Sequence, residues 1–197
     1  MSQLSQPQNC HQTVTKAWIA LGANLAGDAG APDHMVREAF SRLQGLARIA
    51  ELSPLYQSPA FPPGSGPDFV NAVAWIDWDR TADSLLAELH KIERELGRER
   101  RQRWEARVVD LDLLALGDQI LPDLQTQEHW RGMALADAKT LIPDELILPH
   151  PRLTERAFVL QPLSDLDPTW RDPVTGATIQ ALKLALRKED LDAVKPL

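Results

Sequence analysis

The sequence predicts an α+β fold of the ferredoxin-like type, with a βαββαβ core, a mainly antiparallel sheet and extra helices toward the C-terminus. Two observations predict this fold. Apolar runs of strand character alternate with segments in which apolar residues recur at helical spacing. One strand also follows another with no helix between them, which is typical of the split βαβ arrangement. The 197 residues, 44% of them hydrophobic and 25% charged, suffice for one globular domain.

Four segments have the β-branched and aromatic composition that favours strands. They are residues 16–21, 48–56, 69–78 and 108–116. A turn begins at Gly22 after the first strand. Proline and glycine exclude regular structure from residues 58–68, between the second strand and the third.

Two helices connect these strands, and both carry an apolar stripe that would pack against the sheet. The first follows Pro32, with Asp33 as its expected N-cap and Gly45 near its end. The second has Thr81 as N-cap and Gly97 as its C-terminal stop. Their positions complete the βαββαβ order.

The rest of the chain is harder to assign. Residues 117–149 lack clear periodicity and are expected to form an extended loop or insertion, in which residues 128–139 form at most one short helix. A helix capped by Thr154 and a last helix over residues 178–186 would follow. The resulting division is a flexible tail at 1–15, a single domain at 16–186 and a second tail at 187–197.

Charge and composition exclude several classes of function. A net charge of −7 argues against a nucleic-acid binder that works through general basicity. Cys10 is the only cysteine, so an intrachain disulfide or a cysteine-based zinc site is excluded, which suits a reducing cytoplasm. Residues 1–12 lack the apolar core of a signal peptide and no run reaches membrane-spanning length, so we expect neither a leader nor a membrane span. We expect a cytoplasmic monomer that acts on small molecules, with no nucleic-acid or membrane partner.

The most informative stretch is residues 98–116, RERRQRWEARVVDLDLLAL, where a basic run precedes a strand with two aspartates. Alternation along the strand puts Asp110 and Asp112 on one face, with Cα atoms about 6.6 Å apart. Carboxylates at that spacing suit Mg²⁺, which proteins bind with one or two carboxylates plus substrate phosphates. Arginine pairs with phosphate in a bidentate manner. Together these features indicate a polyphosphate site.

Simpler interpretations exist for each half of this stretch. Asp-x-Asp on a strand is often the hydrated face of a half-exposed sheet, and an arginine-rich turn is often a solvated surface. Their juxtaposition favours a site, because like charges on one strand face repel unless a cation accompanies them.

Residues 16–186 resemble the 6-hydroxymethyl-7,8-dihydropterin pyrophosphokinase family of folate biosynthesis. The resemblance rests on five segments in order: AWIALGANL, YQSPAF…PDFVNAV, IERELGR, RWEARVVDLDLLAL and LPHPRLTERAFVLQPL. It implies the ferredoxin-like fold inferred above. It also implies transfer of the pyrophosphoryl group of ATP to the hydroxymethyl oxygen of a reduced pterin, giving AMP.

The resemblance implies which residues bind the metal ions and which contact the phosphates. Asp110 and Asp112 would hold two Mg²⁺ ions around the phosphates of ATP, the co-substrate. The basic stretch would supply the phosphate-contacting Arg98 and Arg107, and the mobile catalytic loop with Arg100 and Trp104. No protein base is evident, and a metal-bound substrate hydroxyl would not need one.

Two further groups of residues match the family's substrate-binding positions. Besides Arg98 and Arg107, the ATP-binding positions are His90, Glu93, His150 and Arg156. Besides Asp110, the pterin-binding positions are Ser58, Pro59, Phe61, Phe69, Asn71 and Phe158. The amide of Asn71 suits the aminopyrimidinone edge of a pterin, and the two matched aromatic positions, Phe69 and Phe158, suit stacking on its ring. Without the resemblance, core phenylalanines, a turn-capping asparagine and a solvated helix face explain most of these residues as well.

Two features depart from the family's pattern, and two rival functions have to be weighed against it. Glu105 and Ala106 stand where the family usually has Gly-Pro, and residues 117–149 are longer than in its shorter members. A catalytically silent ferredoxin-like module would bind a nucleotide or protein partner without needing all of the matched polar residues. An RNA-binding module would need a basic sheet with exposed aromatic residues, which the acidic balance disfavours.

Overall fold

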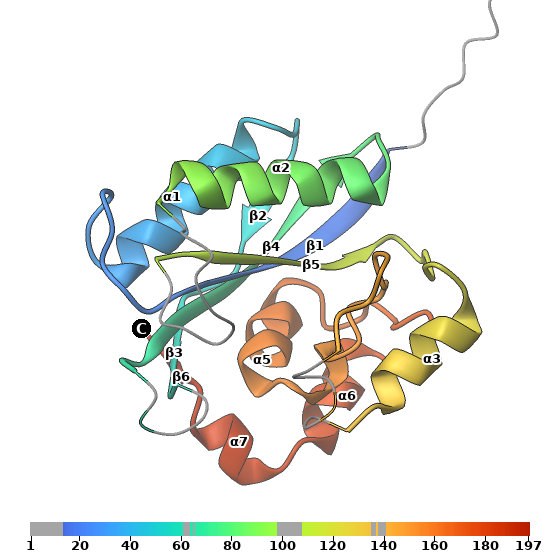
Figure 1. Ribbon diagram of the computed structural model, residues 1–197. Helices are drawn as coiled ribbons and strands as arrows, with labels where there is room; N and C mark the ends of the chain where they lie inside the picture. Colours follow the sequence, from blue (N-terminus) through green and yellow to red (C-terminus); the bar gives the residue numbers. More distant parts are fainter. Residues whose placement is uncertain (1–13, 61–63, 65, 98–107, 135–136, 138–140) are drawn as a thin grey trace, which may run out of the picture.

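Six strands form one antiparallel sheet through the centre of the molecule (Figure 1). The computed structural model describes residues 14–60, 64, 66–97, 108–134, 137 and 141–197. The strands are β1 (Thr15–Ala23), β2 (Ala50–Leu52), β3 (Tyr56–Ser58), β4 (Phe69–Trp78), β5 (Asp110–Leu116) and β6 (Lys195–Pro196). Their order is β5-β1-β4-β3-β6, and β2 pairs with another part of β4. This is the predicted ferredoxin-like arrangement with one strand added at its edge.

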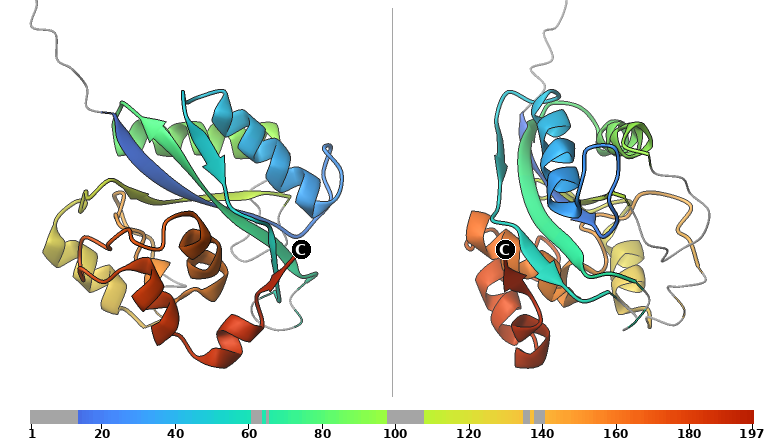
Figure 2. Two further views of the ribbon diagram at one scale, coloured as in Figure 1. Left: turned by 180° about the vertical axis from the view of Figure 1, so that it is seen from behind. Right: turned by 90° about the vertical axis from the view of Figure 1, so that its left-hand side faces the viewer.

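Helices cover both faces of the sheet. They are α1 (Pro32–Gln44), α2 (Ala82–Glu95), α3 (Leu124–Gly132), the 3₁₀ helix η1 (Leu153–Glu155), α5 (Ala157–Leu166), α6 (Ile179–Ala185) and α7 (Lys188–Asp192). α1 and α2 lie on one face, and α5 lies on the other with the remaining C-terminal helices around it (Figures 1 and 2). The predicted site therefore has to lie at an edge or an end of this sandwich.

Side-chain alternation along the strands divides the apolar residues between two cores. Ile19 and Leu21 of β1 point to the face of α1 and α2, where Leu89 joins them. Trp18 points to the opposite face and packs with Leu160 of α5. Burying each such side chain stabilises the fold by about 1.5–3 kcal/mol, so both faces hold β1 in register.

Several predicted elements are confirmed. The strand over residues 69–78 has the predicted ends. The hydroxyl of Thr81 caps α2 by accepting a hydrogen bond from the backbone N–H of Ser84 at 3.2 Å. Gly97 follows α2 with a φ of +89°, a conformation that glycine adopts without strain.

Two predicted N-caps are wrong. Ala31, without a side-chain cap, precedes α1, and Pro32 begins the helix with Asp33 already in its first turn. Thr154 lies within η1, whereas α5 begins at Ala157. In both cases the polar residue lies close to the start of the helix without being its N-cap. The N-cap residues are Ala31 and Arg156, which have extended backbone and no side-chain cap.

The predicted strand over residues 48–56 is two strands, β2 and β3. Pro54 lies between them and has no N–H to continue a ladder. Ser53 bridges this interruption, because its N–H donates to the Val73 carbonyl at 2.9 Å and its hydroxyl accepts from the Val73 N–H at 3.0 Å. β4 therefore keeps a partner along its whole length.

Two segments of the C-terminal half differ from expectation. The helix expected over residues 128–139 shares only residues 128–132 with α3, which starts earlier because the Asp123 carboxylate caps the Thr126 N–H at 2.8 Å. Part of the remaining expected range lies outside the described residues. The expected tail at 187–197 instead forms α7 and β6, and β6 pairs with β3. The N–H of Leu197 also donates to the Leu55 carbonyl at 2.9 Å. The other expected tail lies almost entirely outside the described residues.

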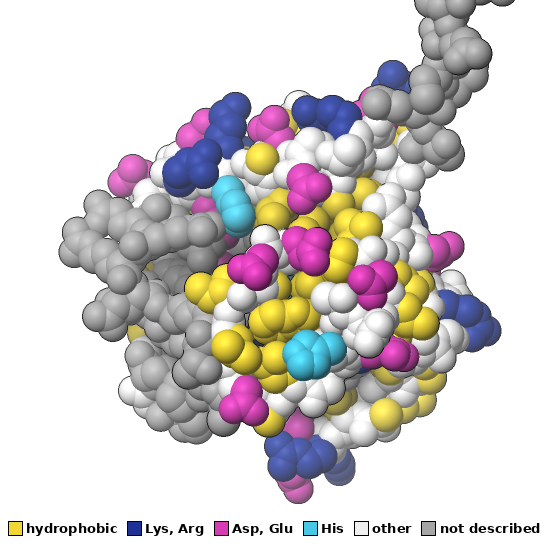
Figure 3. Space-filling model, turned by 45° about the vertical axis from the view of Figure 1, so that its right-hand side comes forward, with side chains coloured by type: hydrophobic (Ala, Val, Ile, Leu, Met, Phe, Trp, Pro, Cys, Tyr) yellow, Lys and Arg dark blue, Asp and Glu magenta, His cyan; other side chains and the backbone are white. Residues whose placement is uncertain are grey.

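The surface carries charges of both signs. On the face shown in Figure 3, acidic side chains are scattered among apolar ones, and Lys and Arg lie mainly toward the rim. Within the described part of the chain, no helix has the length and apolar character needed to cross a membrane.

Candidate active site

A row of directly opposed residues crosses four strands of the sheet. Gly22 of β1 stands opposite Asp110 of β5 on one side and Asn71 of β4 on the other. Asn71 in turn stands opposite Tyr56 of β3. Opposed residues of antiparallel strands share a face, and this face is the one that α5 covers. The fold thus brings Asp110 and Asn71, which are distant in sequence, to the two sides of one glycine.

Asn71 is held in place by its neighbours. Its side chain is buried, and its Nδ2 donates to the hydroxyl of Ser58 at 2.9 Å. A β-carbon on Gly22 would lie 3.5 Å from Asn71 Oδ1 and 3.9 Å from the Phe69 ring. Glycine therefore leaves open the space beside the amide. The structure also brings Ser58, Phe69 and Asn71 together.

The two aspartates of β5 point to the same face and are each partly exposed. Asp112 stands opposite Ala20, one step along the row. Its Oδ2 lies 3.5 Å from Nη1 of Arg156, and the guanidinium carbon of Arg156 lies 5.7 Å from the centroid of the Phe158 ring. Arg156 therefore joins the aspartates to an aromatic residue of α5.

The aspartate pair fits a magnesium site that is completed by substrate. Among the described residues, no group of three or more His, Cys, Asp or Glu side chains forms a metal cage. Mg²⁺ keeps several waters and commonly uses one or two protein carboxylates plus phosphate oxygens. Asp110 and Asp112, on one partly exposed strand face, supply such a donor set.

His150 lies beside β5. Its N–H donates to the Leu114 carbonyl at 2.8 Å, and its Nδ1 accepts from the Arg152 N–H at 3.0 Å. Loss of hydration, followed by the charge of Arg156, lowers the pKa of His150 to about 3, although Asp110 acts in the opposite direction. His150 itself is partly exposed. The protonation state that follows needs only the downward direction of the pKa shift. The imidazole is neutral near pH 7, and because Nδ1 accepts, Nε2 carries the proton.

Glu93 has a different environment from a solvated helix face. It is only 1% exposed, and its Oε1 accepts a hydrogen bond from the Leu111 N–H at 2.8 Å. This bond ties α2 to the outer edge of β5 between the two aspartates. His90, one turn earlier on α2, is partly buried. Glu93 thus holds the strand that carries the predicted metal ligands.

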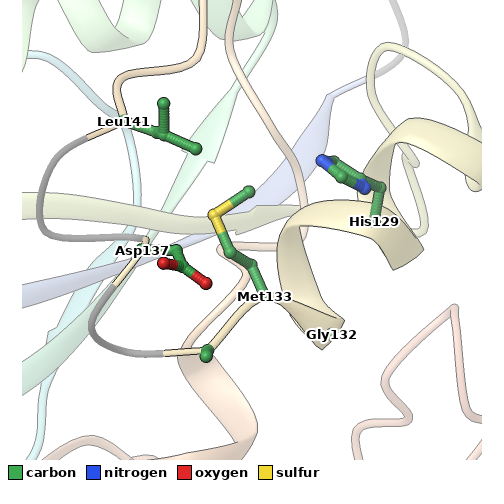
Figure 4. Close-up of a pocket in the computed structure, with 6 residues that line it drawn as sticks. His129, Gly132, Met133, Asp137 and Leu141 are labelled. Atoms are coloured by element: carbon green, nitrogen blue, oxygen red, sulfur yellow. The ribbon is translucent and has the colours of Figure 1, made fainter.

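Two hollows lie near these elements. One, of about 210 Å³, is lined by Ser58 and Pro59 together with Lys195 and other residues of the C-terminal segment. The other, of about 450 Å³, lies at the end of α3 and is lined by His129, Gly132, Met133, Ala134, Asp137 and Leu141 (Figure 4). Only the first contains predicted site residues, so the C-terminal segment lies beside Ser58 and Pro59, two of the predicted pterin-binding residues.

Five predicted site residues lie outside the described residues. They are Phe61, Arg98, Arg100, Trp104 and Arg107. Their roles, including the place of Arg100 and Trp104 in a mobile catalytic loop, stay predictions.

The described site lies within a segment that matches a known protein family. The sequence model of the 7,8-dihydro-6-hydroxymethylpterin-pyrophosphokinase (HPPK) family matches residues 18–168, which include every residue of the row from Asp110 to Tyr56. The chain belongs to the HPPK family. The match also includes His150, Arg156 and Phe158.

Individual HPPK relatives agree with this assignment. A 2-amino-4-hydroxy-6-hydroxymethyldihydropteridine pyrophosphokinase of Pseudomonas aeruginosa is 36% identical over 162 residues, which cover 81% of this chain and 85% of the relative. A protein of the same name from Synechocystis sp. is 31% identical over 193 residues, covering 97% of this chain and 83% of the relative.

Solved structures agree on the fold. The wild-type HPPK-DHPS of Plasmodium falciparum superimposes with a TM-score of 0.60 at 16% identity, covering 89% of this chain. The present chain spans 42% of that much longer protein. At this level of identity the likeness concerns the fold alone.

Sequence reasoning missed several residues that support the site. Gly22 was assigned only to a turn, although its lack of a side chain opens the space beside Asn71. Tyr56 was assigned only to a strand, yet its hydroxyl bonds the Asp165 carboxylate of α5, and burial followed by this bond raises its pKa. Gln127, in the predicted insertion at residues 117–149, is fully buried. A buried polar residue has no local sequence signal, because its partner is remote in the chain.

Proposed function

We propose that this chain transfers the pyrophosphoryl group of ATP to the hydroxymethyl group of 6-hydroxymethyl-7,8-dihydropterin, giving AMP and the pterin diphosphate. The observation that carries the proposal is the row in which Asp110 and Asn71 flank Gly22 on one sheet face. A phosphate-directed group and a heterocycle-directed group thereby face the same space. Membership of the HPPK family and the names of the relatives support the same reaction.

The pterin would bind at the Asn71 end of this row. An amide offers a donor and an acceptor that match the aminopyrimidinone edge, and Ser58 already orients it. Phe69 and Phe158 are each partly buried, so each keeps ring surface available for stacking. We assign Pro59 and Phe61 to the same pocket by their place in the family's pattern.

The nucleotide would bind at the Asp110 end. Asp110 and Asp112 would hold two Mg²⁺ ions, which when bound neutralise charge on the phosphate oxygens. Arg156, now 3.5 Å from Asp112, would exchange part of that contact for a phosphate oxygen. The neutral His150 would donate its Nε2–H to the nucleotide.

The remaining assignments follow the family's pattern. His90 and Glu93 belong to the nucleotide side, with Glu93 acting through the strand that it bonds. Arg98 and Arg107 would contact phosphate, and Arg100 and Trp104 would belong to the catalytic loop. We further propose a cytoplasmic, monomeric enzyme that acts on small molecules and has no nucleic-acid partner.

An assay for AMP formation from ATP, with and without the hydroxymethyl pterin, tests the proposed function. AMP should form only when the pterin and Mg²⁺ are both present. AMP formation without the pterin, or no AMP in the complete mixture, would contradict the proposal. A catalytically silent binding module would give the second result.

A further inference from the structure

The helix of the insertion, α3, is clamped to the segment that contains His150 and Arg156. The insertion is closed at its base, because Leu121 and Leu148 exchange two backbone hydrogen bonds of 2.9 and 3.1 Å. The chain then continues directly into residues 149–156. The insertion is therefore fastened where the predicted nucleotide-binding segment begins.

Gln127 makes the central contact of this clamp. Its side chain is 0% exposed, and its Nε2 donates to the backbone carbonyl of Pro149 at 3.0 Å. Among the described residues, its Oε1 accepts no hydrogen bond. A buried amide that is only partly bonded is a poor choice for stability alone, because an apolar side chain would fill the same space without an unpaired oxygen. The residue type is explained better by the carbonyl that it holds.

A second contact runs in the opposite direction. Arg152, which is 9% exposed, donates from Nη2 to the Met133 carbonyl at the end of α3 at 2.5 Å. The backbone N–H of the same arginine donates to Nδ1 of His150. The outer side of α3 is anchored separately by the ion pair between Arg131 and the buried Asp172. The helix is thus fixed both to the fold and to the segment beside it.

The contact at Pro149 reaches His150 through one peptide unit. Gln127 fixes the carbonyl of that unit, and the N–H of the same unit, which belongs to His150, donates to Leu114 of β5. A peptide held at both its oxygen and its nitrogen has a defined plane. The orientation of this peptide plane fixes the position of the His150 imidazole. It also fixes the start of the turn that leads to Arg156.

We propose that Gln127 is a positioning residue for nucleotide binding. Gln127 orients His150 by holding the Pro149 carbonyl. The proposal rests on the proposed function in taking His150 and Arg156 as nucleotide contacts. It assigns the insertion a role in ATP affinity and none in pterin affinity.

The test compares Gln127→Met with the wild-type protein and with Gln125→Met, the same substitution at an exposed position of α3. Methionine has nearly the same length, fills the buried space and leaves no unpaired amide oxygen, so the variant should keep its melting temperature. Its Kd for α,β-methylene-ATP with Mg²⁺, measured by calorimetry, should rise about 3- to 10-fold. The reason is that the hydrogen bond that fixes the Pro149 carbonyl, and through it His150, is lost. Gln125→Met should bind this analogue as the wild type does.

The pterin serves as the second ligand. The Kd for the hydroxymethyl pterin should not change in Gln127→Met, whereas a merely structural role would weaken both ligands and lower the melting temperature. Unchanged nucleotide affinity, or equal losses for both ligands, would overturn the proposal. Gln127→Asn, whose shorter amide falls short of Pro149, supplies the same comparison if the methionine variant does not fold.

Binding and turnover separate this proposal from the proposed function. A wild-type protein that binds the analogue but forms no AMP would contradict the proposed reaction, and the Gln127 comparison would still be decided by the Kd values. A wild-type protein that binds no nucleotide would overturn both.

Discussion

Asp110 and Asn71 stand opposite the same glycine, Gly22, from the strands on its two sides. The carboxylate suits a metal-bound polyphosphate, and the amide suits the edge of a heterocycle. Their separation is therefore set by the register of three strands, which two apolar cores hold in place.

Replacing either aspartate of β5 by asparagine should remove catalysis and keep the fold. Asp110→Asn or Asp112→Asn should lower turnover by about 10³-fold or more, because each removes a charged Mg²⁺ ligand. Steady-state kinetics across a range of Mg²⁺ concentrations measures the effect, with circular dichroism as the check on folding. Asp118→Asn, at an exposed position just after β5, is the matched control. Near wild-type turnover in the Asp110 or Asp112 variant would refute the metal assignment.

Asn71→Ala should weaken pterin binding more than ATP binding. The variant leaves a polar ligand edge unpaired in a buried pocket, which costs about 1–3 kcal/mol, or an affinity loss of about 5- to 150-fold. Ser58→Ala, which removes the hydroxyl that orients the amide, should have a smaller effect in the same direction. Separate calorimetric titrations of each ligand measure both. Equal losses for the two ligands would mean that Asn71 is structural.

His150 should remain neutral down to acidic pH, with its proton on Nε2. Its pKa is lowered from 6.5 to about 3, chiefly by loss of hydration. As the pH falls below about 6.5, His150 takes up a proton in the unfolded chain but not in the folded chain. The free energy of unfolding should therefore decrease between that pH and about 3. NMR correlation of the imidazole nitrogens reports both tautomer and charge, with the exposed His34 as internal reference. An imidazolium signal from His150 at pH 6 would contradict this prediction.

Asp172→Asn should destabilise the protein. Asp172 is fully buried and receives bonds of 2.6 and 3.1 Å from Arg131, and breaking a buried pair costs about 3 kcal/mol. Burial alone would raise the pKa of Asp172, but hydrogen bonds from Arg131 and Thr175 lower it overall. The wild type should therefore lose this stabilisation as the pH falls below about 4.

Urea denaturation of wild type and variant at pH 7 and pH 3 measures this difference. The exposed pair between Arg187 and Asp190 offers the control Asp190→Asn, which should cause no measurable loss. If the Asp172 variant is as stable as wild type at pH 7, α3 is not anchored through this pair.

Local signals predicted the elements whose causes are local. Phe69–Trp78 has strand composition along its whole length, and Thr81 caps the next helix through a residue three positions away. Asp110 and Asp112 share a face because strand geometry requires it. For such features the sequence and the structure agree closely.

Features that depend on remote partners were missed. The segment 187–197 is polar and short, and its order depends on remote partners: β6 pairs with Gln57 and Tyr56 of β3, and Val194 is buried in a cluster with Tyr56 and Ala157. Gln127 has the sequence context of an exposed helical residue, yet its partner Pro149 lies 22 positions away. Composition shows which residues are able to bond, whereas the identity of the partner depends on the complete fold.

In the proposed reaction the β- and γ-phosphates of ATP move together, and isotopic labels on the three phosphates can follow this transfer. The enzyme is incubated with Mg²⁺, the hydroxymethyl pterin and ATP labelled in separate reactions at the α-, β- or γ-phosphorus, and the products are separated by chromatography. We predict that the β- and γ-labels both appear in the pterin product and that the α-label remains in AMP. Transfer of the γ-label alone, with the β-label retained in ADP, would contradict the proposed pyrophosphoryl transfer.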